Sequence, residues 1–295
     1  MSATDHPATP ALISGKALAS RLRAEVRAEV RALREAGVRP RMSVVVASDD
    51  PATRVYVSSK AKTAEALGLE FTVVDLGSGA SQSHLEATLD GLSRDPEVHG
   101  VMLEFPLSRG LDPDRALRRI CPEKDVEGLT PGNLGLIAAG RESEALLAPT
   151  PQACLLLAAT QGELRGERVA VVGPGRTVGR PLIHMLINHG ATVTVVTEGT
   201  RDVRAALEGC RFVFVAVGRA ALLGPDQLHD GQIVIDAGIN VNEGGVCGDV
   251  NPAVYPRLAA YTPVPGGVGP VTSVLVFRNF VRALRLQRGE NVHDR

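Results

Sequence analysis

The sequence lacks the residues from which disulfide scaffolds and zinc sites are built. It contains no tryptophan and only four cysteines among 295 residues. The cysteines stand far apart, with no Cys-x-x-Cys pair and no histidine at ligand spacing, so we expect neither a disulfide framework nor a bound metal. Reduced thiols of this kind are typical of a cytoplasmic protein.

The sequence also has no excess of one charge and no long apolar run. The 32 basic and 33 acidic residues leave a net charge of -1, with no basic block. This balance offers no electrostatic surface for nucleic acid or for an anionic membrane. No apolar run reaches the roughly 18 residues that a membrane span requires. We therefore expect a small-molecule substrate, and no nucleic-acid or membrane partner.

Lysine is scarce, since nearly all basic residues are arginine. The lysines are Lys16, Lys60, Lys62 and Lys124. A coding bias toward arginine explains the general pattern. Arginine keeps its proton in a protein, however, whereas a lysine ammonium can release one. A lysine retained in such a chain is therefore a candidate for a titratable amine.

What is present is an alternation of short apolar segments with helical patterns, which predicts an α/β protein with parallel sheets. In the first half we expect strands at Ser43–Ala47, Glu70–Asp75 and Val98–Glu104, and helices at Gly15–Val38, 51–67 and Ser81–Ser93. In the second half we expect strands at Arg168–Val172, Thr192–Val196, Phe212–Ala216 and Ile233–Asp236, and helices at Gln152–Gln161, Val178–His189, Arg201–Glu208 and Gly269–Gln287. The stretch Cys121–Pro151 interrupts the alternation and is expected to be rich in loops.

A glycine-rich turn follows the strand at Arg168–Val172. Gly173, Gly175 and Gly179 stand between this strand and the next helix. Glycines let the backbone approach a pyrophosphate, and a helix N-terminus attracts the anion. The third glycine comes one residue later than in G-x-G-x-x-G, so an ordinary tight turn is the alternative.

Glu198 follows the next strand, where an acidic residue in a dinucleotide-binding domain bonds the ribose hydroxyls. This placement favours NAD. A 2′-phosphate there would be repelled unless Arg176 or Arg201 neutralises the carboxylate, and a solvated loop residue is the plain alternative.

Several segments together resemble the methylenetetrahydrofolate dehydrogenase/cyclohydrolase family. They are YVSSKAK at Tyr56–Lys62, MLEFPL at Met102–Leu107, PEKDVEG at Pro122–Gly128, PTPQA at Pro149–Ala153, VVGPGRTVGRP at 171–181, VIDAGIN at Val234–Asn240 and TPVPGGVGPVT at Thr262–Thr272. The last of these is the most distinctive. The resemblance spans nearly the whole chain.

The resemblance implies two α/β domains with a cleft between them. A catalytic, folate-binding domain would comprise residues 1–148 and 270–295, and a Rossmann-like NAD(P)-binding domain residues 149–269. It further implies a homodimer built through the cofactor domains. The implied reactions are oxidation of 5,10-methylenetetrahydrofolate by NAD(P)+ and hydrolysis of the methenyl product to 10-formyltetrahydrofolate.

The family pattern assigns roles to residues of the first domain. Tyr56 and Lys60, four apart on a predicted helix, share one face. By resemblance Lys60 is the general acid/base and Tyr56 packs on the folate. Glu104 stands where the family usually has glutamine. A carboxylate there would form an ion pair and favour the charged amine, unless Glu104 is itself protonated or stabilises the cationic product. We count Lys60, Glu104 and Tyr56 as catalytic candidates.

The expected folate-binding residues are Tyr56, Asp125, Glu127, Pro265, Gly266 and Gly267. Glu127 replaces the aspartate that binds the pterin in the family, and a structural turn is the alternative interpretation. The expected cofactor residues are Gly173, Pro174, Gly175, Arg176, Thr177, Gly179, Glu198 and Ile239. Pro174 and Gly175 occupy places where NADP-using members often carry Arg and Ser. The family favours NADP, whereas these residues favour NAD, so we expect NADP and leave NAD open.

The cyclohydrolase activity is expected to be weakened by Glu104. The alternatives are a dehydrogenase-only enzyme, a folate- or nucleotide-binding paralogue without catalysis, and an unrelated dehydrogenase acting on a shikimate-like acid. Retention of Lys60 and the PGGVGP segment argue against the last two.

Overall fold

The computed structural model describes residues 9–290. The chain folds as two compact units, one of residues 21–149 with 273 onward, the other of residues up to 20 with 150–272. Each unit has its own parallel sheet, so the α/β class predicted from the sequence is confirmed. We call them the three-stranded and the six-stranded unit. No helix among residues 9–290 is both long and apolar enough to cross a membrane.

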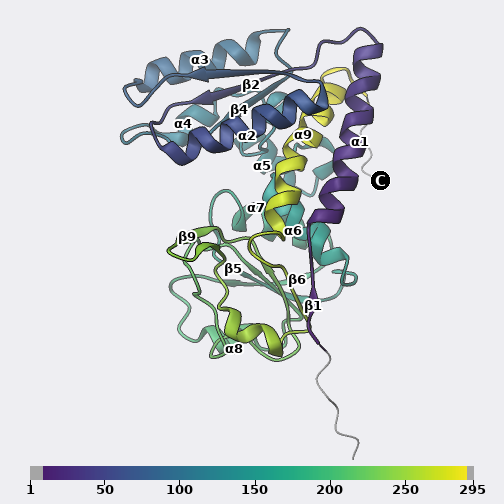
Figure 1. Ribbon diagram of the computed structural model, residues 1–295, viewed down its shortest axis with the longest axis vertical. Coiled ribbons are helices and arrows are strands. Elements are labelled where there is room, and N and C mark those ends of the chain that lie inside the picture. The colour runs from purple at the N-terminus through teal and green to yellow at the C-terminus, as the bar shows by residue number, and fades with distance from the viewer. Residues whose placement is uncertain (1–8, 291–295) are drawn as a thin grey trace, which may run out of the picture. The chain divides into compact units, whose positions relative to one another are not determined.

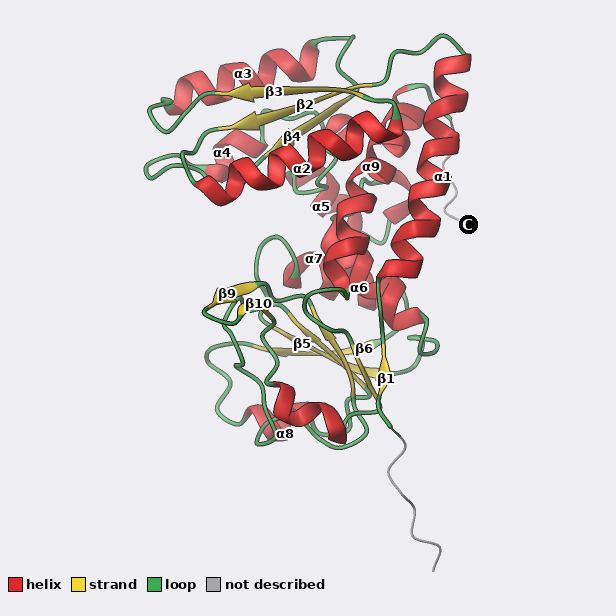
Figure 2. Cartoon of the chain, in the orientation of Figure 1, coloured by secondary structure: helices red, strands yellow, loops and turns green. Residues whose placement is uncertain are grey.

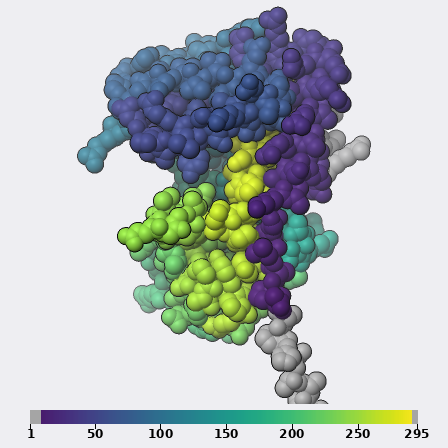
Figure 3. All heavy atoms as spheres, viewed as in Figure 1, coloured from purple at the N-terminus to yellow at the C-terminus, as the bar shows by residue number. Residues whose placement is uncertain are grey.

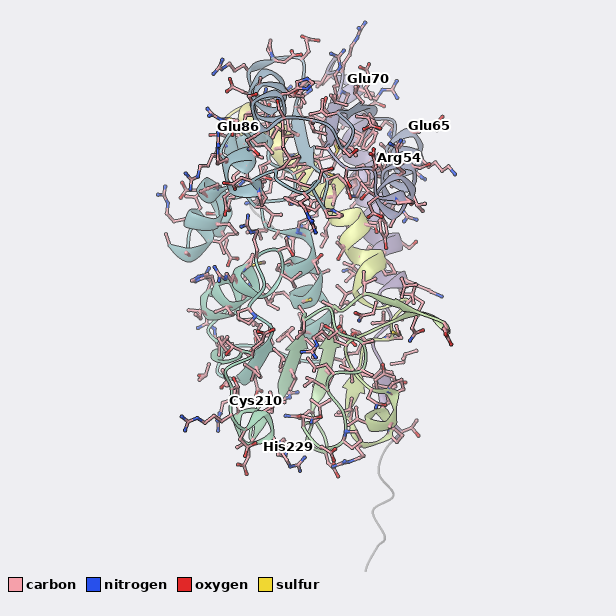
Figure 4. All side chains as sticks on the ribbon, turned by 90° about the vertical axis from the view of Figure 1, so that its left-hand side faces the viewer. Arg54, Glu65, Glu70, Glu86, Cys210 and His229 are labelled. Carbon is pink, nitrogen blue, oxygen red and sulfur yellow. The ribbon has the colours of Figure 1, made fainter. Side chains whose placement is uncertain are left out.

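The three-stranded unit has the strand order β3-β2-β4, with every pairing parallel. Its elements are β2 (Arg41–Val46), α2 (Pro51–Leu67), β3 (Glu70–Asp75), α3 (Gln82–Arg94), β4 (Gly100–Leu103), α4 (Pro113–Leu117), α5 (Pro131–Ala138), and most of α1 (Lys16–Glu35) and α9 (Val268–Gln287). Figure 1 and Figure 2 show α2 and α3 on opposite faces of this sheet. In Figure 4, Arg54 and Glu65 of α2 likewise lie on the other side of the sheet from Glu86 of α3.

Strands β2 and β4 are almost completely buried because helices cover both faces of the sheet. Helix α9 fits closely against β4, since a Cβ added to Gly100 would lie 2.6 Å from the Phe280 ring. The Asn279 amide of α9 donates to the carbonyls of Val126 at 2.9 Å and Leu147 at 2.6 Å. The C-terminal helix therefore completes this unit.

The six-stranded unit has the strand order β1-β11-β8-β7-β5-β6, again with every pairing parallel. Its elements are β1 (Ala11–Leu12), α6 (Pro149–Ala159), β5 (Arg168–Val172), α7 (Gly179–Asn188), β6 (Thr192–Val196), α8 (Val203–Leu207), β7 (Phe212–Val215), β8 (Ile233–Asp236), β9 (Asn240–Asn242), β10 (Gly245–Cys247) and β11 (Ala260–Tyr261). From β5 the chain turns to β6 on one side and then to β7 on the other. The carboxyl end of β5 is thus the point where the strand order reverses, the usual ligand position in such sheets.

The short β9–β10 hairpin projects from the surface of its unit, light green in Figure 3. Three 3₁₀ helices, at Pro122–Lys124, Glu142–Glu144 and Pro252–Arg257, complete the described elements.

The interval Cys121–Pro151 is more ordered than its composition suggested. Helix α5 begins after Thr130, whose hydroxyl accepts a hydrogen bond from the backbone of Asn133 at 3.4 Å. The eight residues of α5 are too few, and too rich in glycine, for a helical period to show.

The compact units divide the chain differently from the predicted domains at the N-terminus. Strand β1 pairs with β11, so residues 9–20 belong to the six-stranded unit, whereas the sequence predicts them in the first domain. The first eight residues lie outside the described part. The assignment of one function to each predicted domain stays a prediction.

Candidate active site

Helix α2 positions Tyr56 and Lys60. The carboxylate of Asp50 caps the helix by accepting the Ala52 amide at 3.2 Å, and Pro51 stands in the first turn, where its missing N–H is not needed. The four-residue spacing puts Tyr56 and Lys60 on one face. The Tyr56 side chain is 53% exposed, so its ring remains available to a ligand.

The amine of Lys60 contacts the carboxylate of Glu104. Its Nζ lies 2.9 Å from Oε1 and 2.6 Å from Oε2 of Glu104. Glu104 comes directly after β4, and its backbone N–H donates to the Val45 carbonyl at 3.0 Å, so it stands at the carboxyl end of the sheet. Glu104 is buried and the Lys60 side chain is 23% exposed. Two charged groups this close form a strong, charge-assisted pair.

Asp125 organises the loop that follows the first 3₁₀ helix. Its Oδ2 accepts the Thr130 amide at 2.7 Å and the Asn133 side-chain amide at 3.1 Å. The residue is 1% exposed, and burial raises the pKa of its carboxyl group. These internal bonds tie Asp125 to the start of α5 through Oδ2.

Glu127 differs from Asp125 in this respect. Among the described residues, its carboxylate has no hydrogen-bond partner. Burial raises the pKa of Glu127 to about 7; the charge of Lys60 opposes the shift, and the charges of Glu104 and Asp125 add to it. Near neutral pH this carboxyl group is therefore divided between its acid form, which can donate a hydrogen bond, and its carboxylate form.

The loop at Pro263–Gly267 in the six-stranded unit is shaped by close contacts between main-chain segments. Gly266 has a φ of +112°, a conformation that favours glycine, and its carbonyl accepts the Gly15 amide at 2.9 Å. A Cβ on Gly267 would lie 2.7 Å from the Pro263 carbonyl oxygen. The family resemblance predicts small residues in this loop. The packing of the loop itself requires them, whether or not a folate binds there.

The glycine-rich turn after β5 is equally tight. Gly173 has a φ of +91°, and a Cβ placed on it would lie 2.6 Å from the Ala216 carbonyl oxygen. A Cβ on Gly179, at the start of α7, would lie against main-chain atoms of Gly173 and Pro174. The turn therefore holds the N-terminus of α7 close to the carboxyl ends of β5 and β7.

A pocket of about 580 Å³ opens beside this turn, a size within the usual range for small-molecule sites. Gly173, Pro174, Gly175 and Glu198 line it, and Glu198 is exposed. No Lys, Arg or His among residues 9–290 forms an ion pair with Glu198. The pocket therefore combines a phosphate-binding type of turn with a carboxylate at the end of β6 that forms no ion pair among the described residues, and Arg219 lines the same pocket.

Two family models match the chain over most of its length. The tetrahydrofolate dehydrogenase/cyclohydrolase catalytic domain matches residues 13–127, and the NAD(P)-binding domain of the same enzymes matches residues 148–288. The chain is also 54% identical over 301 residues to the bifunctional protein FolD of Deinococcus radiodurans, covering 100% of both chains. The chain belongs to the tetrahydrofolate dehydrogenase/cyclohydrolase family.

Other relatives agree with this placement. A bifunctional protein FolD 2 of Pseudomonas putida is 42% identical, with 94% of this chain and 93% of the relative covered. Among solved structures, the bifunctional FolD enzyme of Campylobacter jejuni superposes with a TM-score of 0.90 at 35% identity, covering 94% of this chain and 99% of that one. The FolD of Trypanosoma brucei, solved with an NADP cofactor and an inhibitor, has a TM-score of 0.88 at 32% identity, with 95% and 98% covered.

The structure brings together only part of the cofactor set expected from the family. Gly173, Pro174, Gly175 and Glu198 line the pocket, whereas four other candidates do not: Arg176, Thr177, Gly179 and Ile239. Gly179 packs against the main chain of Gly173 and Pro174 without lining the pocket itself. Ile239 is 56% exposed and stands directly before β9. The roles of all eight remain predictions.

Sequence reasoning overlooked several residues that line this pocket. They are Thr197, Thr200, Val217, Arg219 and Gln227, among others. Thr197 and Val217 closely follow the predicted strands at Thr192–Val196 and Phe212–Ala216. The rule that ligands bind at the carboxyl ends of parallel strands could have found them.

Proposed function

We propose that this protein oxidises 5,10-methylenetetrahydrofolate with NAD(P)+ and hydrolyses the methenyl product to 10-formyltetrahydrofolate. Membership of the dehydrogenase/cyclohydrolase family supports both activities. The observation that carries the proposal is the Lys60 amine held at the carboxyl end of the three-stranded sheet, beside Glu104 and with the exposed Tyr56 on the same helix face.

The residues around the pocket beside the Gly173 turn fit a nicotinamide nucleotide. The tight turn at Gly173 and the N-terminus of the ten-residue helix α7 suit a pyrophosphate, and Glu198 suits ribose hydroxyls. When bound, the nucleotide supplies the acceptor for a hydride from the bridging methylene carbon. The chain's own contribution to this step is to bind and orient both reactants.

Hydrolysis needs no nucleotide. Water adds to the methenyl carbon and loses one proton, which leaves a neutral carbinolamine. As the bond from that carbon to N5 breaks, the hydroxyl gives up its remaining proton to form the formyl C=O and N5 takes a proton, so that the formyl group stays on N10 and one proton is released overall. Lys60 is the residue proposed to hold or move these protons. Glu104, and Glu127 in its carboxylate form, would place negative charge beside a cationic methenyl group, which favours its formation electrostatically.

Steady-state kinetics test the whole proposal. Purified protein is given the folate substrate with each nucleotide, and the appearance and decay of methenyl absorbance are followed separately. Cofactor reduction together with methenyl formation is expected. Absence of reduction with both nucleotides rejects the dehydrogenase assignment, whereas folate binding without turnover, seen by calorimetry, favours the non-catalytic paralogue.

Glu104→Gln is expected to raise the ratio of cyclohydrolase to dehydrogenase rates. Removing the carboxylate dissolves the ion pair, and an amine without an adjacent anion is the better proton acceptor. Glu70→Gln is the control, because Glu70 pairs with Arg41 on the surface of the same sheet. A lower ratio instead assigns Glu104 to stabilising the cation, and an unchanged ratio removes it from the mechanism.

The choice of nucleotide depends on residue 198. The family expectation is NADP, and the Trypanosoma brucei relative was solved with that cofactor. Glu198 lines the pocket without a cationic partner among the described residues, so a 2′-phosphate beside it meets a like charge. We infer that the protein accepts NADP but that Glu198 lowers its affinity, so that NAD serves at least as well.

Glu198→Gln is expected to raise kcat/KM for NADP by about tenfold, because like-charge repulsion of roughly 1–2 kcal/mol is removed. The value for NAD should fall slightly, since a neutral amide is a weaker acceptor for ribose hydroxyls. Glu208→Gln, an exposed change next to α8, serves as control. Equal values of the NADP/NAD ratio in both variants and the unmodified protein contradict the inference.

Two further expectations come from the family and the composition. A homodimer built through the cofactor domains is supported by β6, which is an edge strand with unpaired backbone groups on one side. A cytoplasmic location is supported by four cysteines that are all free.

A further inference from the structure

Asp249 is a buried carboxylate with an unusually complete set of donors. Its side chain is fully buried, two residues after β10. Oδ2 accepts the backbone amides of Val217 at 2.7 Å and Gly218 at 2.8 Å. Oδ1 accepts the Arg219 amide at 2.9 Å and the Asn240 side-chain amide at 2.8 Å. Four donors occupy about all the acceptor positions that a carboxylate offers.

These donors belong to two loops that bear on the nucleotide pocket. Val217 and Arg219 line that pocket, and their segment follows directly on Ala216, whose carbonyl oxygen packs against Gly173. Asn240 is the residue after Ile239, which the family pattern places near the nicotinamide. One carboxylate thus fixes at the same time a wall of the pocket and the stretch Gly238–Asn240, which leads from β8 into β9 and which we call the Gly-Ile-Asn turn.

A second buried carboxylate fixes Asp249 itself. Asp236, at the end of β8, accepts the amides of Asp249 at 3.2 Å and Val250 at 2.9 Å. Burial raises the pKa of Asp236 to about 6, and the nearby charge of Asp249 adds to the shift. Gly248 lets the backbone approach this carboxylate, since any Cβ on it would overlap the Asp236 side chain. The main chain is therefore adapted to hold Asp249 in place.

Neither carboxylate forms an ion pair with a basic residue in the described part of the chain. Burying charge without a counter-ion is unfavourable, and backbone amides compensate only where the surrounding loops are held in one geometry. Two buried carboxylates without counter-ions are unfavourable for stability, but they hold the loop in one geometry. That loop forms a wall of the nucleotide pocket.

We propose that Asp249 is a positioning residue for nucleotide binding, which holds residues 217–219 and, through Asn240, the Gly-Ile-Asn turn in the geometry that receives the nicotinamide nucleotide. The proposal rests on the proposed function only in taking the pocket as the NAD(P) site. It assigns Asp249 no part in hydrolysis, because hydrolysis uses no nucleotide.

The test is Asp249→Asn, with nucleotide dissociation constants measured by calorimetry in the absence of folate. An amide side chain points N–H groups at backbone donors, so the dissociation constants for NAD+ and NADP+ should both rise about tenfold or more. Hydrogen exchange at the amides of Val217, Gly218 and Arg219 should become faster. The rate of methenyl hydrolysis should stay within about twofold.

Asp202→Asn is the matched control. Asp202 is an exposed carboxylate in the same unit that accepts the Ala205 amide at 2.9 Å, and asparagine caps a helix equally well. It should leave nucleotide binding unchanged. If Asp249→Asn does not fold, Asn240→Ala removes the tie to the Gly-Ile-Asn turn alone, and a rise of about threefold in the dissociation constants is expected.

Three results overturn the proposal. The first is an unchanged dissociation constant despite faster exchange at residues 217–219. The second is a loss of hydrolysis and thermal stability in proportion to the loss of binding, which indicates a general structural role. The third is a failure of the unmodified protein to bind either nucleotide, which rejects the proposed function as well. In the first two the unmodified protein still binds, so only the role of Asp249 is rejected.

Discussion

Lys60→Met is expected to lower the rate of methenyl hydrolysis by about 10²- to 10⁴-fold, the usual contribution of a positioned acid or base. The Lys60 amine is the proposed proton carrier, and methionine keeps the length of the side chain without the nitrogen. The dehydrogenase rate should fall less, because hydride transfer moves no proton through the amine. The measurement is methenyl decay at fixed substrate, beside nucleotide reduction in the same preparation.

Lys60→Arg distinguishes a role of Lys60 in proton transfer from a role of its positive charge alone. Arginine can keep the ion pair with Glu104 but does not release a proton in a protein. Hydrolysis by this variant at near the original rate would reject Lys60 as acid/base and leave it an electrostatic role. Lys62→Met is the matched control, since Lys62 is exposed on the same helix. It follows Lys60 by two residues and therefore lies on a different face of α2.

Stability must be followed alongside these rates. Removing Lys60 leaves the buried Glu104 without its cation, and an uncompensated buried charge is destabilising. The double variant Lys60→Met with Glu104→Gln removes both charges. It should recover thermal stability lost by Lys60→Met, while hydrolysis stays low. This pattern attributes the loss of rate to the amine rather than to unfolding.

The longer strands of both sheets could be predicted from the sequence. The predicted bounds of Glu70–Asp75, Arg168–Val172 and Thr192–Val196 are those that the structure has. These runs are rich in β-branched residues and bounded by turn residues, so the local signal is strong. The short strands β1 and β11 gave no such signal. They pair residues about 250 positions apart, and two residues carry no detectable period.

The same contrast holds for the candidate sites. Lys60 and Glu104 could be expected to meet, because the family resemblance assigns both positions to one site. Asp249 could not be found in this way. Its partners at Val217 and Gly218 are backbone amides some 30 residues away. Every residue except proline has such an amide, so the sequence does not show which amides will bind Asp249. The role of Asp125 was also hidden, since its bonds to Thr130 and Asn133 depend on helix α5, which was not predicted.

The proposed activities make different demands on the chain, and this gives a means of separating them. Hydrolysis is proposed to depend on Lys60 and its neighbours in the three-stranded unit. Oxidation is proposed to depend in addition on the glycine-rich turn of the six-stranded unit, because only oxidation uses a nucleotide. A change confined to that turn should therefore remove one activity and spare the other.

Gly179→Ala is the change of this kind with the largest expected effect. A Cβ at this position would lie against the Gly173 carbonyl oxygen and 2.7 Å from Cα of Pro174. Both are main-chain atoms of the turn that lines the pocket, so the turn itself must move. A displacement of about 1 Å in a positioning element costs roughly 100-fold in rate, and we expect kcat/KM for the nucleotide to fall by about that factor. Methenyl hydrolysis should change little.

Nucleotide binding followed by fluorescence titration, with hydrolysis measured on the same sample, tests this expectation. Gly91→Ala is the control, because Gly91 lies within α3 with open space around its Cβ position, and alanine there should stabilise the helix by about 0.5–1 kcal/mol. Equal loss of both activities in Gly179→Ala would show that the turn supports the fold as a whole. Loss of oxidation alone ties the missing Cβ of Gly179 to nucleotide binding, and it explains why glycine is needed at a position whose side chain would not reach the pocket.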